Sequence, residues 1–182
     1  MACGYKNDQL YNRNSIFESN GVAFATERLK EEHETLRQHL KGLEMNAKEV
    51  VLLKDPSACL VVLEKLKGQT SDFMEELERH SLWEDKELFP FLHNYFHYQP
   101  VPSIMPSFWI LEKDHMLGVS FIQSFLDALL DIKAVVEKKQ LLEVTSFLIQ
   151  ACLILNDHLT MEEQIVYPLT EKVLTDLDSF FS

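Results

Sequence analysis

The sequence predicts an all-α protein, an antiparallel up-down-up-down four-helix bundle preceded by an N-terminal arm. Three observations predict this class. The 182 residues include only 5 glycines, which leaves few turn positions for a many-stranded sheet or barrel. Hydrophobic residues make up 46% of the chain, enough to build a buried core. Apolar residues recur with the spacing of a helix face over most of the chain.

The first elements follow from local signals. Residues 1–21 are polar, rich in asparagine and aperiodic, so we expect an arm there and the bundle domain over residues 22–182. The first helix should begin at the start of that domain and end in the low fifties. Asp55 followed by Pro56 is a typical N-cap before a proline in the first turn, so the second helix should begin there and continue to about Phe96.

Prolines divide the rest of the chain. Pro90 should kink the second helix or break it locally. The segment 98–107 contains three prolines and is the longest expected connection. Two further helices are expected at about 106–138 and 141–167, with a short polar turn between them and a short final helix after Pro168. Short turns between long helices make sequential helices antiparallel neighbours.

Charge and cysteine content exclude several functions. The formal net charge of −12, without basic runs, disfavours nucleic acid and membrane surfaces as partners. Cys3, Cys59 and Cys152 form no CxxC pair, so we expect free thiols and neither a disulfide framework nor a thiolate metal site. The sequence has no apolar segment typical of a secretion signal or a membrane span, so we expect a cytoplasmic protein.

An internal repeat is the most informative feature. An HxxxE motif followed by an apolar residue, an aromatic residue and proline occurs at residues 80–90 and again at residues 158–168. Each copy is preceded, at a similar distance, by a histidine that follows an acidic residue. The sequence therefore indicates a duplicated helical hairpin with six candidate metal ligands, His33, His80, Glu84, His115, His158 and Glu162.

The spacing of these six residues favours a metal site. Residues four apart on a helix project from one face, so each HxxxE presents an imidazole and a carboxylate to one point. The neighbouring positions on both faces are apolar, so these groups should point into the core, where a bound cation would compensate a buried carboxylate. Counted from the turns, the histidines of each hairpin lie at similar heights, within about 9 Å at a helical rise. All six side chains can therefore meet in one layer.

The donor set indicates the kind of metal. Four imidazoles as terminal ligands and two carboxylates as bridges suit two first-row metal ions. Nitrogen and oxygen donors without thiolate favour iron or manganese, with zinc as another occupant. Six protein ligands leave coordination positions open on two six-coordinate ions. A small molecule could bind there.

These residues resemble the hemerythrin-like (HHE cation-binding) family. The resemblance covers residues 22–175 and lies in the order H, HxxxE, H, HxxxE with the trailing LFP and VYP sequences. It implies a four-helix bundle that holds two non-haem iron ions with an oxo or hydroxo bridge and binds O₂ or a related small ligand. Carried over by position, the terminal ligands would be His33, His80, His115 and His158, and the bridges would be Glu84 and Glu162.

Two positions depart from the invertebrate oxygen carriers of that family. Those proteins have a second histidine four residues after the ligand of the third helix, where this chain has Val119. They also end their last motif as HxxxxD, where this chain has Glu163. By this comparison, one iron would have one histidine fewer than in the carriers and would be more open or bound by another donor.

Other polar residues are expected to lie outside the centre. His93 and His97 are too far along their helix to join it, so we expect an exposed pair near the C-terminal end of that helix, where imidazolium complements the helix dipole. His39 should be exposed or support the centre from outside. Asp85 and Glu163 should be surface residues, with a supporting role as the alternative.

Three functional hypotheses follow. The first is a protein that binds or senses a small ligand such as O₂, NO or peroxide, or takes part in iron and redox handling. The second is a di-iron enzyme with peroxidase, NO-reducing or iron-centre repair activity, for which the sequence shows neither a general acid nor a substrate pocket. The third is a helical interaction module with a structural metal, whose acidic face engages a protein partner or a second copy of the chain.

Overall fold

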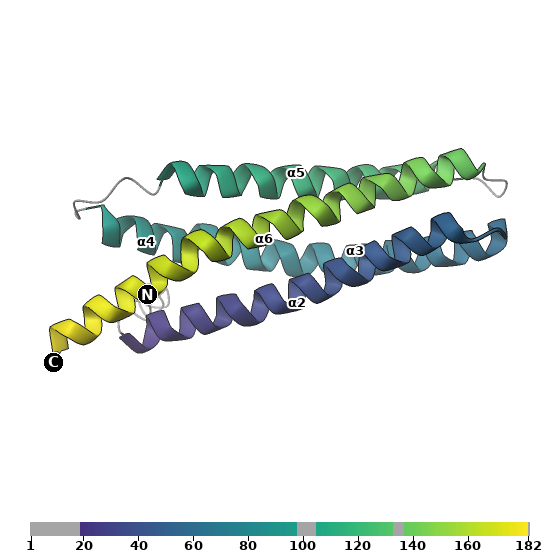
Figure 1. The fold of residues 1–182 in the computed structure, drawn as a ribbon. Coiled ribbons are helices and arrows are strands. Elements are labelled where there is room, and N and C mark those ends of the chain that lie inside the picture. Colours follow the sequence, from purple (N-terminus) through teal and green to yellow (C-terminus); the bar gives the residue numbers. More distant parts are fainter. Residues whose placement is uncertain (1–18, 98–104, 133–136, 182) are drawn as a thin grey trace, which may run out of the picture.

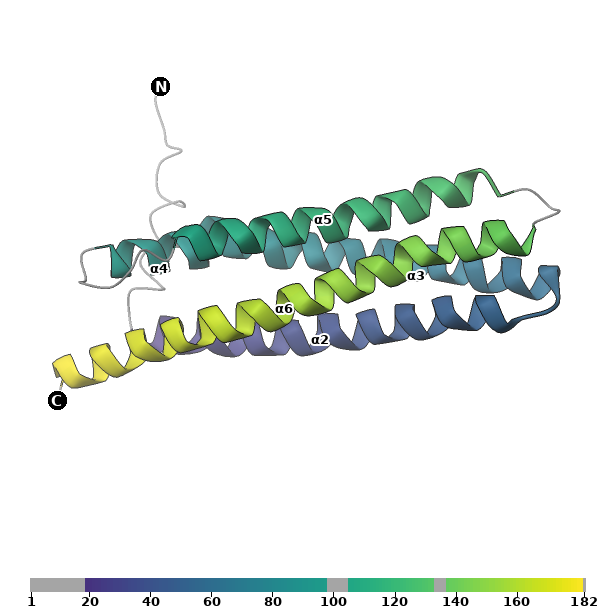
Figure 2. The same ribbon diagram turned by 45° about the horizontal axis from the view of Figure 1, so that its top comes forward.

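The computed structural model describes residues 19–97, 105–132 and 137–181, and every element in these segments is helical. The elements are α2 (Ser19–Leu52), α3 (Pro56–Trp83), the π-helical turn η1 (Glu84–Leu88), α4 (Phe89–Phe96), α5 (Met105–Leu130) and α6 (Lys138–Phe181). Because η1 joins α3 and α4 without a gap, these elements form four long rods that alternate in direction (Figures 1 and 2). The prediction of an all-α four-helix bundle is confirmed.

The start of α3 follows the sequence signal. The Asp55 side chain accepts a hydrogen bond from the backbone N–H of Ser57 at 3.0 Å, and Pro56 occupies the first turn. Here the N-cap satisfies a donor that the helix itself cannot, and the proline lacks the N–H that would be left unpaired. The predicted second helix then continues to Phe96, as expected.

Pro90 and Pro168 behave differently from one another. Pro90 lies in the first turn of α4, which follows the five-residue π turn η1. The helix therefore changes its type locally just before this proline, and α4 continues beyond it. Pro168 lies inside the single helix α6, and the prediction of a separate final helix is wrong. Val166 and Val173, on either side of it, are fully buried in one apolar cluster, and this packing keeps the helix continuous through the proline.

Three predicted boundaries shift. The first helix begins at Ser19, and residues 1–18 of the predicted arm lie outside the described residues. The expected connection at 98–107 is cut short by the start of α5 at Met105, and residues 98–104 also lie outside the described part. The turn expected at 138–140 is wrong, because α5 already ends at Leu130 and α6 begins at Lys138.

Two apolar clusters fill the bundle, with a layer of buried polar residues between them. One cluster, near the α2/α3 turn, includes Leu40 and Phe125, and the other, near α4, includes Leu92 and Val166. The buried polar residues between them are His33, His80, Glu84, His158 and Glu162. The core is therefore interrupted at one height by ionisable groups from three of the four rods.

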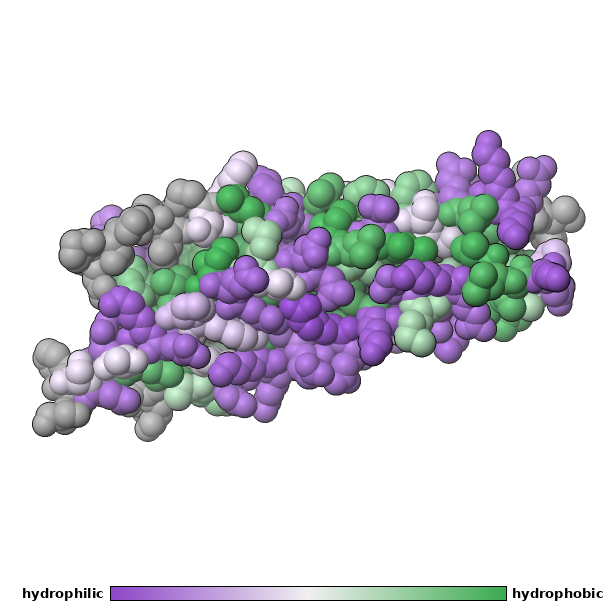
Figure 3. Space-filling model, in the orientation of Figure 1, coloured by the Kyte–Doolittle hydropathy of each residue, from purple (hydrophilic) through white to green (hydrophobic). Residues whose placement is uncertain are grey.

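The rods do not pack equally. Helix α6 packs along both α2 and α5, and α3 packs on α2, whereas the contact between α3 and α5 is sparse. In the view of Figure 3, hydrophobic side chains gather along α5 and the adjacent part of α6, and the α2 side is mostly hydrophilic. Trp109, Met116 and Leu117 on α5 are among the exposed apolar residues. In the described part of the chain, no helix combines the length and apolar character needed to cross a membrane.

Candidate metal centre

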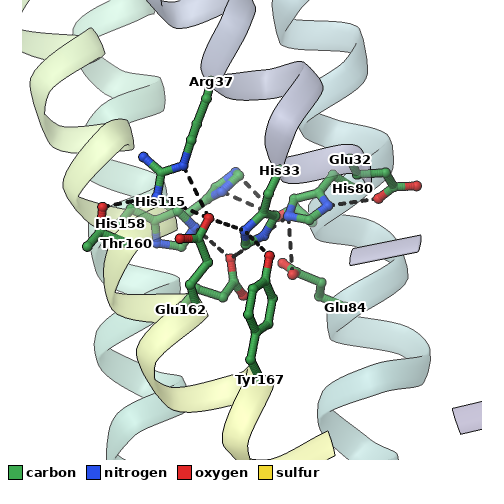
Figure 4. A network of polar contacts seen from close by, with 12 residues as sticks. Glu32, His33, Arg37, His80, Glu84, His115, His158, Thr160, Glu162 and Tyr167 are labelled. Carbon is green, nitrogen blue, oxygen red and sulfur yellow. Dashed lines mark hydrogen bonds and ion pairs between the residues drawn. The ribbon is translucent and has the colours of Figure 1, made fainter. Parts of the chain in front are cut away.

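Four predicted ligands form a compact group at the polar layer. His33 comes from α2, His80 from α3, Glu84 from the first position of η1 and Glu162 from α6 (Figure 4). One potential ligand atom of each lies within 4.8 Å of the others, and all four residues are buried. This set, called the inner group below, could hold a metal ion.

The second carboxylate oxygen of Glu162 is the meeting point of three imidazoles. Its Oε2 lies 3.3 Å from His33 Nε2, 3.7 Å from His158 Nε2 and 3.9 Å from His80 Nε2. Glu84 Oε1 lies 3.2 Å from the same nitrogen of His80. The Nε2 atoms of three histidines and the two carboxylates thus converge on one small volume.

These convergent atoms lack hydrogen-bond partners among the described residues. They are His33 Nε2, His80 Nε2, His158 Nε2, Glu84 Oε1 and both oxygens of Glu162. Native proteins satisfy nearly all buried polar atoms, because an unpaired one costs about 1–3 kcal/mol. A cation bound between them would accept lone pairs from all of these groups, so the residues fit a metal site of nitrogen and oxygen donors.

Burial and charge divide the two glutamates. Burial, together with the charge of Glu162, raises the pKa of Glu84 well above its usual range. Burial acts on Glu162 in the same direction, but contacts with His33, His80 and His158 lower its pKa below the usual range. Without metal, the surroundings therefore favour the protonated form of Glu84 and the ionised form of Glu162.

The outer nitrogen of His80 is bound by a carboxylate. Burial would lower the pKa of His80, but Glu84, Glu162 and Glu32 together raise it well above its ordinary value. Glu32 Oε2 lies 2.8 Å from His80 Nδ1, across the α2/α3 interface. A carboxylate on Nδ1 fixes the ring orientation and directs Nε2 at the centre.

His33 is oriented from α6. Its Nδ1 lies 3.2 Å from Glu163 Oε1, and the Tyr167 hydroxyl approaches the same nitrogen at 3.4 Å. Arg37 donates from Nε to the same oxygen of Glu163 at 3.1 Å and also bonds the side chains of Asn156 and Thr160. This side of the centre is closed by a hydrogen-bonded network (Figure 4).

His115 and His158, called the flanking pair below, lie beside the inner group. Their ring centroids are 5.6 Å apart, and His158 reaches Glu162 as described. His115 is half-buried on α5, and among the described residues its ring nitrogens have a hydrogen-bond contact only with the Ser81 hydroxyl, at 3.3 Å from Nε2. Burial and the neighbouring histidines lower the pKa of His115 to about 4, and burial lowers that of His158, so both rings are neutral and able to coordinate metal.

Two adjoining pockets lie between α3 and α5, where these helices pack sparsely. A pocket of about 160 Å³ is lined by Glu84, His115 and His158. A larger pocket of about 380 Å³ is lined by Met74, Leu77, Leu82 and Val119, among others. Both include Ser81, Asp85 and His115, so they adjoin, and together they are called the groove below; its smaller pocket reaches Glu84 and His158.

Several supporting residues were not found from the sequence. Glu32, Tyr167 and Ser81 contact the candidate ligands across helix interfaces, and Arg37 contacts Glu163. Glu32 and Tyr167 belong to the repeated pattern, but the sequence assigned none of the four a role at the centre. Glu163 was expected at the surface with a supporting role as the alternative, and its side chain, 29% exposed, takes that supporting role through His33.

The remaining histidines lie outside the centre, as expected, but the prediction that His93 is exposed is wrong. His39 is largely exposed and its Nδ1 pairs with Glu76 Oε2 at 2.7 Å. His93 is half-buried and His97 exposed at the end of α4, with ring centroids 5.4 Å apart. None of these three histidines belongs to the inner group.

Comparison with known protein families, curated proteins and solved structures finds no match for this chain. The fold and the site therefore define its class by themselves: a four-helix bundle with a buried group of histidines and glutamates that could hold a metal ion.

Proposed function

We propose that this protein is a hemerythrin-like metalloprotein that holds two non-haem iron ions and binds or senses a small ligand such as O₂, NO or peroxide. The observation that carries the proposal is the convergence of three imidazole Nε2 atoms and two carboxylates, all buried and without hydrogen-bond partners in the described part of the chain. The inner group and the flanking pair would hold the metal, with Glu84 and Glu162 shared between the two ions.

The donor chemistry supports iron, with manganese or zinc as other occupants. Imidazole and carboxylate ligands without thiolate suit these metals. When bound, iron supplies a redox-active centre with coordination positions that the protein leaves open. The chain itself orients the histidines through Glu32 and Glu163 and excludes water with the two apolar clusters.

The two sides of the centre differ, and this supports one route for the ligand. Glu163, Arg37 and Tyr167 close the α2/α6 side with hydrogen bonds. The groove between α3 and α5 reaches Glu84 and the flanking pair. A small ligand would therefore enter through the groove and meet the centre beside His115.

Anaerobic loading with Fe(II), followed by metal analysis and an optical spectrum after exposure to air, NO or peroxide, tests this function. We expect two iron ions per chain and charge-transfer bands that depend on the added ligand. The double variant Glu84→Ala with Glu162→Ala should lose both, whereas His39→Ala, which removes an exposed histidine, should keep them. Substoichiometric iron in the wild-type protein under these conditions would reject the proposal.

A second candidate, a di-iron enzyme, is favoured by the size of the groove. A pocket of about 380 Å³ beside His115 is larger than a diatomic ligand needs. Its apolar residues could hold an organic substrate or reductant next to the centre. Steady turnover of peroxide or NO with an added reductant would favour the enzyme, and a single stoichiometric reaction would favour the binding protein.

A further inference from the structure

The four histidines differ in the hydrogen-bond partners of the ring nitrogen that does not face the centre, called the outer nitrogen below. In the inner group, Nδ1 of His80 and Nδ1 of His33 each have a carboxylate partner, at 2.8 and 3.2 Å. Among the described residues, Nδ1 of His158 has no hydrogen-bond partner, and the ring nitrogens of His115 have only a serine hydroxyl. One pair of histidines is held in place, and the other is not.

The sequence repeat shows why the flanking pair lacks carboxylate partners. Aligning His33 with His115 places Glu32 opposite Asp114, and aligning the two HxxxE motifs places Glu163 opposite Asp85. Both glutamates that orient the inner group are thus replaced by aspartates in the equivalent positions. An aspartate is one methylene shorter, and no hydrogen bond joins either one to the flanking pair in the described residues.

The same alignment shows that the other two residues that support the inner group have apolar counterparts. Arg37, which fixes Glu163, aligns with Val119, and Tyr167, whose hydroxyl approaches His33, aligns with Phe89. Valine and phenylalanine cannot donate or accept a hydrogen bond through their side chains. Each of the four residues that support the inner group is therefore matched, beside the flanking pair, by a residue with a shorter or an apolar side chain.

Exposure sets His115 apart from the other three histidines. His33, His80 and His158 are 1%, 2% and 3% exposed, whereas His115 is half-buried and lines both pockets of the groove. A metal ion held by the inner group would be enclosed by protein. An ion held by the flanking pair would face the groove.

From this asymmetry we infer that the chain has one tight metal position, at the inner group, and one weak, exchangeable position at His115 and His158. Outer carboxylate partners change metal affinity by roughly 10- to 100-fold, so the two dissociation constants should differ by at least about tenfold. This inference rests on the proposed function, because it assumes that the centre binds two ions.

Stepwise metal binding tests the inference without an activity measurement. Metal-free protein is titrated with Fe(II) under anaerobic conditions, the bound ions are counted by native mass spectrometry, and a chelator is then added. Two separate binding steps are expected, and one ion should remain after chelation. His115→Ala should remove the second step and leave the first, whereas His93→Ala should change neither, because its ring lies outside the centre.

Reciprocal variants give the inference a sharper test. Asp85→Glu with Asp114→Glu restores the longer carboxylates and should tighten the second step by roughly tenfold. Glu32→Asp with Glu163→Asp shortens the carboxylates of the inner group and should weaken the first step by a similar factor. A circular dichroism spectrum of each variant confirms that the bundle is intact.

The outcomes separate this inference from the proposed function. Two ions bound with indistinguishable affinity and both retained against the chelator would overturn the inference and leave the proposed function standing. Loss of the first step in His115→Ala, or a second step that survives it, would also overturn the inference. Failure of the wild-type protein to bind any iron would overturn both.

Discussion

Glu162 shows how strongly a single buried carboxylate depends on its surroundings. It is fully buried, three imidazole nitrogens lie within 3.9 Å of one of its oxygens, and neither oxygen has a hydrogen bond in the described residues. Glu84, its counterpart in the other HxxxE motif, is equally buried, and burial together with the charge of Glu162 raises its pKa. A cation that binds Glu84 therefore competes with a proton for this carboxylate.

Metal binding should release protons and weaken as the pH falls. Burial and the charge of Glu162 raise the pKa of Glu84, and the carboxylates around His80 raise its pKa despite burial, so a proton is held within this coupled pair more tightly than on either free side chain and a metal ion has to displace it. Calorimetric titration in buffers of different ionisation enthalpy measures the proton count. Proton uptake, or an affinity that rises on acidification, would contradict this assignment.

The same pKa shifts determine how the stability of the metal-free protein changes with pH. The folded-state pKa values of Glu84 and His80 lie above their unfolded values, so the folded chain binds more protons than the unfolded chain between those values. This contribution is present below the unfolded pKa and is lost as pH rises toward the folded pKa. The stabilisation gained on metal loading should therefore increase with pH across the neutral range, which melting curves of both forms would measure.

Between elements, Arg37 joins α2 to α6 beside the centre. Its guanidinium bonds Glu163, Asn156 and Thr160, and its side chain is 27% exposed. Arg37→Met should lower the free energy of unfolding by about 1–2 kcal/mol, since several hydrogen bonds to a charged group are lost. Urea unfolding measures this change, with the exposed Lys41→Ala as a control expected to stay within about 0.5 kcal/mol. Equal stabilities of the two variants would show that the network is only superficial.

Gly118 sets the distance between α5 and α6. A Cβ atom at this position would lie 2.5 Å from Cγ and Cδ2 of Leu155, which is fully buried. Gly118→Ala should therefore reduce the free energy of unfolding by about 1–3 kcal/mol through overpacking, partly offset by the better helix propensity of alanine. Because Gly118 lies one turn after His115, displacement of α5 should also weaken metal binding at the flanking pair.

Two other glycines provide matched controls. A Cβ atom at Gly42 or Gly68 would meet no atom within 4 Å. Gly42→Ala and Gly68→Ala should raise stability by about 0.5–1 kcal/mol, since alanine loses less conformational entropy in a helix. Thermal or urea unfolding of the three variants compares the effects directly. Stabilisation by all three substitutions would mean that α5 and α6 can separate at no cost.

At the scale of the whole molecule, a metal ion bound in the polar layer would link the helices between the two apolar clusters. A ligand that binds only the folded state stabilises it by about 4 kcal/mol at a free concentration 1,000-fold above its dissociation constant. For a chain of this length that is roughly 10 °C in melting temperature. Calorimetry of the iron-loaded and chelated protein should show this difference, and Glu84→Ala with Glu162→Ala should abolish it.

The sequence predicted what depends on local pattern. Helical periodicity and the Asp55 cap defined the rods, and the HxxxE spacing directed His80 and Glu84 inward. Contacts such as Glu32 with His80, or Arg37 with Glu163, join different helices and depend on how each rod is rotated about its axis, which a single sequence does not reveal. Pro168 was misjudged because a local breaking signal was outweighed by packing of the valines around it.

The sparse contact between α3 and α5 has a consequence for local unfolding. Helix α5 is held along α6 but has little packing on its other side, whereas α2 and α6 are each covered along two neighbours. Partial opening costs least where buried contacts are fewest, so backbone amides of α5 should exchange with deuterium faster than those of α2. Faster exchange in α2 would contradict this order. Because α5 carries His115, local opening of this helix would expose the groove while the inner group remains buried.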